Sequence, residues 1–155
     1  MPLPVSKNEV IFKPGPASRG DVEVMLTTLQ KNLEKFSVQQ ENFLLVFLFG
    51  SFARGFGTDE SDVDVAIMFE KVPDFYELCD LKDQLSRCAG KEVDILILNT
   101  ASPIIKMQVL RYGVLVKRDK ETYNDFFVST FNEYNDLKYL RKEIEENLLK
   151  GRIYA

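Results

Sequence analysis

The sequence of 155 residues contains no histidine. This absence excludes every site that depends on an imidazole, including Ser-His-Asp triads, Cys-His pairs, HExxH zinc sites and zinc fingers. A general base must therefore be a carboxylate, a lysine or a tyrosine. Any metal site is expected to be lined by oxygen atoms, which suits Mg²⁺, Mn²⁺ or Ca²⁺.

Cysteine is scarce, and long apolar runs are missing. The two cysteines, Cys79 and Cys88, fall in one predicted helix at a spacing that is not typical of a zinc site, so we expect structural thiols in a reducing compartment. No apolar run approaches the roughly 20 residues that a membrane span needs. The first ten residues also lack the features of a signal peptide. We therefore predict a cytoplasmic protein that does not bind a membrane.

An excess of positive charge is absent too. The chain has 20 Lys and Arg against 24 Asp and Glu, which gives a formal net charge of −4. Sequence-independent binding of nucleic acid relies on Lys and Arg to neutralise phosphates, so nucleic acid is not an expected partner. A hydrophobic content of 45% in a chain of this length suits one domain with a substantial core.

The chain is predicted to divide into three segments. Prolines and a lack of periodicity predict an extended N-terminal arm at residues 1–19. A core follows at residues 20–118. Residues 119–155 form a C-terminal helix and tail that belong to the same domain.

Hydrophobic periodicity predicts the elements of the core. Helices are expected at residues 21–36, 75–87, 103–112 and about 120–149, and strands at residues 43–49, 63–69, 92–98 and 114–117. Ser102 and Gly113 are expected to cap the helix that they flank. This order predicts an α/β (α+β) fold, with one small mixed sheet and flanking helices.

A Gly-Ser turn follows the apolar strand at residues 43–49 and is expected to open a short helix. The N–H groups at a helix N-terminus favour phosphate, and Gly50 lets the backbone approach a ligand closely. Ser51 is thus a candidate phosphate-binding residue, and Arg54, one turn later, is placed to reach a nucleotide phosphate. The alternatives are a plain N-cap serine and a solvated surface arginine.

Two aspartates lie at the start of the next strand. Asp62 and Asp64 are two residues apart, so in a strand they point to the same side. Carboxylates held side by side repel each other unless a hard cation lies between them. A phosphate-binding turn followed by paired carboxylates is typical of Mg²⁺-assisted nucleotidyl transfer. The alternative is an ordinary pair of turn aspartates.

Asp94 lies in an otherwise apolar strand, where a carboxylate needs an edge, a partner or a metal. By alternation it shares a face with Leu96, opposite Val93. If this strand pairs with the strand at residues 63–69, all three aspartates converge. Two of them are then placed to ligate a metal pair, and Asp94 to polarise an incoming hydroxyl.

Ser51, ten intervening residues and Asp62-x-Asp64 resemble the GS-x10-DxD signature of the DNA-polymerase-β-like nucleotidyltransferase superfamily. The runs GSFARG, SDVD and EVDIL resemble the minimal nucleotidyltransferases of that superfamily. The later runs LNTASP and VLRYGVLV are similar to the MntA-type antitoxins, which partner HEPN-domain toxins. The resemblance covers most of residues 20–145.

The resemblance implies a nucleotidyltransferase fold and an activity, the transfer of AMP from ATP to a tyrosine of a cognate HEPN toxin with Mg²⁺, two ions being expected. It places the metal-binding and catalytic carboxylates at Asp62, Asp64 and Asp94, and the nucleotide-binding turn at Gly50 and Ser51. Two alternatives stay open: a nucleotidyltransferase for a small molecule or an RNA end, and an antitoxin that neutralises by binding alone.

The predicted C-terminal helix carries an apolar stripe longer than a small sheet can cover. Its members are Tyr123, Phe126, Phe127, Thr130, Tyr134, Leu137, Ile144 and Leu148. One interpretation packs the whole stripe within the domain. The other packs the first half and leaves residues 140–149 to dock on the toxin or on a second copy of the chain, so a homo-oligomer is left open.

Overall fold

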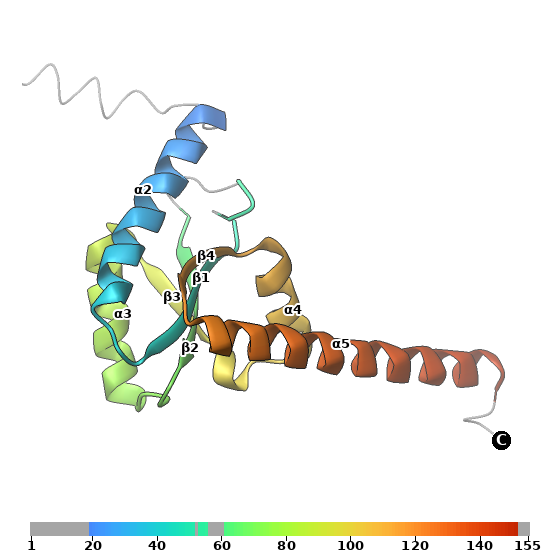
Figure 1. Ribbon diagram of the computed structural model, residues 1–155. Coiled ribbons are helices and arrows are strands. Elements are labelled where there is room, and N and C mark those ends of the chain that lie inside the picture. The colour runs from blue at the N-terminus through green and yellow to red at the C-terminus, as the bar shows by residue number, and fades with distance from the viewer. Residues whose placement is uncertain (1–18, 52, 56–60, 152–155) are drawn as a thin grey trace, which may run out of the picture.

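The computed structural model describes residues 19–51, 53–55 and 61–151, and these form four α-helices, one short 3₁₀ helix and a four-stranded sheet (Figure 1). The elements in chain order are α2 (Arg19–Val38), β1 (Phe43–Phe49), β2 (Val63–Phe69), α3 (Phe75–Ala89), β3 (Val93–Ile97), the 3₁₀ helix η1 (Leu98–Thr100), α4 (Pro103–Tyr112), β4 (Val114–Arg118) and α5 (Lys120–Leu149). The predicted helices and strands are confirmed, although β3 is shorter than expected because η1 follows it.

The sheet has the strand order β3-β2-β1-β4. β1 pairs antiparallel with β2 and with β4, whereas β2 pairs parallel with β3, so the sheet is mixed as predicted. Figure 1 shows α2 and α3 on one side of the sheet and α4 and α5 on the other. The predicted fold class, with helices flanking a small sheet, is confirmed.

Alternation along the strands divides the interior into two cores. The core beneath α2 and α3 receives the side chains of Val63, Val65, Ile67 and Phe69 from β2, of Val93 from β3, of Leu29 and Leu33 from α2, and of Leu85 from α3. The core beneath α4 and α5 is smaller. It contains Leu45 and Phe47 from β1, Ala66 from β2, Leu98, Val109 from α4 and Phe126 from α5.

The segment after β1 differs from its prediction. Its described residues form a turn rather than the expected helix, and the Arg54 N–H donates to the Gly50 carbonyl at 3.2 Å. Gly50 and Gly55 both have a positive φ, 79° and 82°. A left-handed residue on each side limits the segment to one turn. Residues 52 and 56–60, the predicted arm at residues 1–18 and the tail at residues 152–155 lie outside the described residues.

The predicted caps of α4 are confirmed, with one difference in mechanism. The Ser102 hydroxyl accepts from the Ile105 N–H at 3.4 Å. Gly113 ends the helix with a φ of −72°, which is not left-handed. Glycine is needed there for space, because a Cβ would collide with the carbonyl oxygen of Val109.

The two cysteines have different surroundings. The Cys88 thiol donates to the Asn32 carbonyl at 3.1 Å and ties α3 to α2, and burial raises its pKa. Cys79 is a free, exposed thiol, so the prediction of a structural role is wrong for this residue. In the described part of the chain, no helix combines the length and apolar character of a membrane-spanning segment.

The two parts of α5 have different surroundings. Phe126 and Thr130 in its first part are buried, and Lys106 of α4 forms an ion pair with Glu133 at 3.5 Å. The C-terminal part of the helix extends away from the sheet (Figure 1). The large apolar side chains of this distal part of α5 (residues 138–149) are all exposed: Tyr139, Leu140, Ile144, Leu148 and Leu149. The full stripe is therefore not packed within the described domain.

Candidate nucleotide-binding and catalytic site

Two of the three predicted carboxylates meet at one end of the sheet. Asp64 of β2 and Asp94 of β3 are register partners in the parallel pair, so their side chains lie next to each other on the same face. This is the α4/α5 face, because Asp64 alternates with Val63 and Val65 of the other core. Asp62 immediately precedes β2 and is exposed. The predicted pairing of the two strands is thus confirmed.

The charges of the cluster act on one another. The pKa of the Asp64 carboxyl is raised above its usual range, first by partial burial and then by the negative charges of Asp94 and Asp62. All three causes disfavour the charged form. A bound cation would remove this penalty, which makes the cluster a site where positive charge is favoured.

Gly50 brings the turn against the carboxylates. Its neighbour Phe49 is the register partner of Asp64. A Cβ on Gly50 would overlap with Oδ2 of Asp64, and the φ of 79° is one that other residues rarely adopt. Glycine is thus required for both space and conformation. The Gly50–Ser51 turn and the carboxylates form one continuous site.

Lys82 of α3 adds a positive charge that the sequence did not predict. Its Nζ lies 3.3 Å from Oδ1 of Asp94 and 3.6 Å from Oε1 of Glu92. The hydrogen bond and charge of Asp94 raise the pKa of the lysine. Lys82 therefore orients Asp94 from the edge of the sheet. No motif includes this residue, and only the packing of α3 beside β3 brings it there.

The donor set suits Mg²⁺. Among the described residues, no three carboxylates or thiols lie close enough to hold a metal ion by themselves. Magnesium is rarely held by an all-protein cage: one or two carboxylates bind it together with phosphate oxygens of the substrate. Asp64 and Asp94, beside the Gly50–Ser51 turn, fit that pattern.

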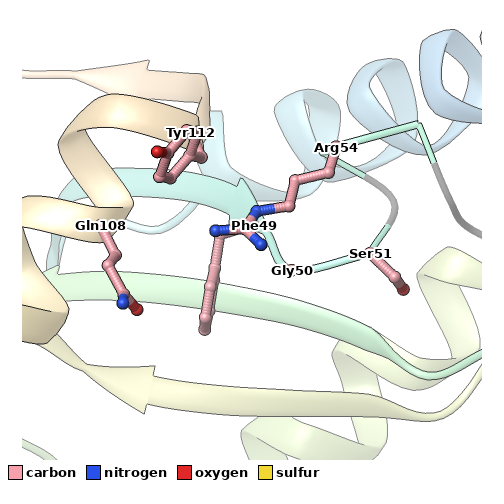
Figure 2. A pocket seen from close by; sticks show the side chains of 6 residues that line it. All are labelled: Phe49, Gly50, Ser51, Arg54, Gln108 and Tyr112. Atoms are coloured by element: carbon pink, nitrogen blue, oxygen red, sulfur yellow. The ribbon is translucent and has the colours of Figure 1, made fainter.

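A cavity of about 390 Å³ begins at the turn and continues along α4. Its lining residues are Phe49, Gly50, Ser51, Arg54, Gln108 and Tyr112 (Figure 2). The Arg54 side chain extends from the turn to the ring of Tyr112, with Cζ 4.5 Å from the ring centroid, while Ser51 points away (Figure 2). Such an exposed cation–π contact contributes only about 0.5–1 kcal/mol.

The sequence interpretation missed Phe49, Gln108 and Tyr112. Phe49 was assigned to the core strand only. Gln108 and Tyr112 are four residues apart on α4, so they share one face of that helix. That spacing is the signal in the sequence that could have identified them. It points to the site only once the structure shows that α4 ends near the end of β1. Arg54, predicted to reach phosphate, contacts the ring of Tyr112 in this structure, and its contact with phosphate stays a prediction.

Comparisons with known proteins agree with this arrangement. The family described as "Polymerase beta, Nucleotidyltransferase" matches residues 31–122. The Protein adenylyltransferase MntA of Thermococcus cleftensis is 32% identical over 97 residues, which cover 62% of this chain and 93% of the relative.

Solved structures share the fold. A chain in a crystal structure of a toxin–antitoxin with AMP-PNP superposes with a TM-score of 0.65 at 24% identity, covering 77% of this chain and 98% of that chain. A chain in the structure of a tri-AMPylated Shewanella oneidensis HEPN toxin in complex with an MNT antitoxin gives 0.62 at 22% identity, covering 80% and 98%. Both likenesses concern the fold.

Proposed function

The chain belongs to the polymerase beta nucleotidyltransferase family and, within it, to the MntA-type protein adenylyltransferases, and we propose that it transfers AMP from ATP to a tyrosine of a cognate HEPN-type toxin. The observation that carries the proposal is the pairing of Asp64 with Asp94 directly beside the Gly50–Ser51 turn. Paired carboxylates beside a turn that could bind phosphate support nucleotidyl transfer.

The roles follow from position. The Gly50–Ser51 turn binds the triphosphate through backbone N–H groups, and the missing Cβ of Gly50 allows close approach to Asp64. Asp62, Asp64 and Asp94 are the residues that would hold Mg²⁺, with two ions expected. When bound, Mg²⁺ would neutralise the phosphates and stabilise the charge that develops on transfer.

The transfer itself exchanges one bond for another. The tyrosine oxygen attacks the α-phosphorus, an O–P bond forms, and the bond from the α-phosphorus to the pyrophosphate oxygen breaks with its electron pair. Asp94, oriented by Lys82 at 3.3 Å, is placed to accept the proton of the tyrosine hydroxyl. Most of the rate enhancement would come from positioning and charge neutralisation.

We assign the role of holding the acceptor to the distal part of α5. Its apolar side chains are exposed, and it extends beyond the sheet (Figure 1). Leu140, Ile144 and Leu148 are four residues apart, so they form one stripe that suits a helix of the partner. A structure of this fold, in which an MNT antitoxin is in complex with a HEPN toxin, favours the toxin as occupant over a second copy.

The experiment for the activity uses ATP labelled at the α-phosphate, Mg²⁺ and a candidate HEPN-domain toxin. We expect label on a tyrosine of that protein, located by mass spectrometry. Label on a small molecule or an RNA end would replace the proposal with that alternative. An absence of label, with the toxin still neutralised, would show that the chain acts by binding alone.

The docking role is tested by replacing Ile144 and Leu148 together with aspartate. Both side chains are exposed, so the domain stays folded, which circular dichroism verifies. We expect co-purification of the toxin and modification of the toxin to fall together. Lys142→Asp lies on the opposite face of the helix and is the matched control. Full binding and full modification by the double variant would contradict the role, as would dimers of wild-type chain that the substitutions dissociate.

A further inference from the structure

The cavity along α4 continues the catalytic site in one direction. Gly50 and Ser51 line it, and Phe49, whose side chain forms one wall, is the register partner of Asp64. A nucleotide with its phosphates at the turn and the carboxylates therefore has this cavity as the adjoining space for its nucleoside. This step rests on the proposed function, because it takes the turn to bind a triphosphate.

The lining of the cavity suits a flat, uncharged heteroaromatic group. Phe49 and Tyr112 provide aromatic surfaces, and Gln108 provides an amide with both a donor and an acceptor. The volume of about 390 Å³ is within the range of roughly 300–1,000 Å³ that small-molecule sites occupy. No carboxylate is among the lining residues that the structure describes.

The Tyr112 ring is already used as a stacking surface. The planar guanidinium of Arg54 lies 4.5 Å from its centroid, and Figure 2 shows the side chain reaching back from the turn to do so. Tyr112 is half exposed, so a second planar group can replace the guanidinium without disturbing the core. Arg54, released from the ring, is then free to turn toward the phosphates.

We infer that the adenine of ATP binds in this cavity, stacked on the Tyr112 face that Arg54 covers in this structure, and that Gln108 reads its edge. An amide pairs with the adenine edge through one donor and one acceptor, as Asn and Gln do with adenine in DNA. A carboxylate at the same position accepts only, which matches the two donors of the guanine edge. Gln108 is therefore a specificity-determining residue, and Arg54 links recognition of the base to binding of the phosphates.

The test measures binding of three ligands, ATP, GTP and inorganic tripolyphosphate, to the full chain in Mg²⁺ by calorimetry. Wild type is expected to bind ATP more tightly than tripolyphosphate. Tyr112→Ala is expected to weaken ATP binding about tenfold, through loss of base stacking, and to leave tripolyphosphate binding unchanged. Tyr112→Phe keeps the ring and is the matched control, with ATP affinity retained.

Gln108→Glu provides the sharper readout, because the ratio of GTP to ATP affinity cancels the repulsion that the new charge exerts on either triphosphate. We expect that ratio to rise about tenfold, as the preferred edge pattern changes. An unchanged ratio, or equal loss of ATP and tripolyphosphate binding in Tyr112→Ala, would overturn the inference and leave the proposed transfer intact. Failure of wild type to bind ATP at all would overturn both.

Discussion

The two faces of β2 show how one strand serves two purposes. On the α2/α3 face, Val63, Val65 and Ile67 are fully buried, and their only role is packing. On the other face, the same strand presents Asp64, whose carboxyl is partly buried beside Asp94. The tightly packed face fixes the backbone, and that fixed backbone holds carboxylates together that would otherwise move apart.

The largest effect is expected at the charged face. Asp64→Asn and Asp62→Asn each remove a charge from the proposed metal site, so each should reduce AMP transfer by at least about 10²–10³-fold. The fold should remain intact, since neither side chain supports the packed face. Initial rates with α-labelled ATP, with circular dichroism on the same samples, check this. Wild-type rates in either variant would place the chemistry elsewhere.

Substitutions on the packed face of β2 should lower the stability of the fold. Ile67→Ala opens a cavity at a fully buried position and is expected to lower the free energy of unfolding by about 2–5 kcal/mol. Ile67→Val, the smaller truncation, should lower it by about 0.5–1.5 kcal/mol. Urea unfolding measures both. A loss for Ile67→Ala no larger than that for Ile67→Val would mean that this face is not what holds the strand.

Substitution of two glycines distinguishes the effect of backbone strain from the effect of a steric contact with Asp64. Gly50→Ala and Gly55→Ala both place alanine at a positive φ, which costs about 1–2 kcal/mol. Only at Gly50 does the new Cβ meet Asp64, since nothing described lies within 4 Å of a Cβ at Gly55. We expect the two variants to have similar melting temperatures. We expect AMP transfer to be lost only in Gly50→Ala. Equal transfer activity of the two variants would contradict the steric role of Gly50.

The smallest effect concerns stability without metal. Because the folded-state pKa of Asp64 is raised, protonation favours the fold: the stability linked to this group is complete below the unfolded-state pKa and is lost as pH rises through the folded-state pKa. Asp64→Asn should therefore be more stable than wild type at neutral pH, by at most about 1 kcal/mol after screening by solvent. The difference should vanish in acid. Denaturation at several pH values in chelator tests the sign, and a variant less stable than wild type at neutral pH would contradict it.

Local patterns predicted most of the fold and the charged part of the site. Alternation placed Asp94 with Leu96 and opposite Val93, and the spacing of Asp62 and Asp64 indicated a shared side before any pairing was visible. These properties depend on residues near one another in sequence. The meeting of Asp64 with Asp94 needed one further condition, the pairing of β2 with β3, and the apolar character of both strands favoured it.

The remainder depends on contacts between distant segments. Lys82 reaches Asp94 only because α3 packs beside β3. Tyr112 meets Arg54 only because β4, which follows it, pairs with the end of β1. The described residues after Ser51 form a turn and not the expected helix, and Gly50 and Gly55 on either side both have a positive φ. Hydrophobic periodicity carries no information about such contacts.

The central claim is that the carboxylates and the Gly50–Ser51 turn form a single Mg²⁺-dependent site for ATP. Calorimetric titration of ATP into the wild-type chain, once in Mg²⁺ and once in chelator, tests it most directly. The clustered negative charges should repel the triphosphate without a cation, so affinity should be at least about tenfold tighter in Mg²⁺, and Asp64→Asn should reduce that difference. Equal affinity of the wild-type chain in Mg²⁺ and in chelator would contradict the account.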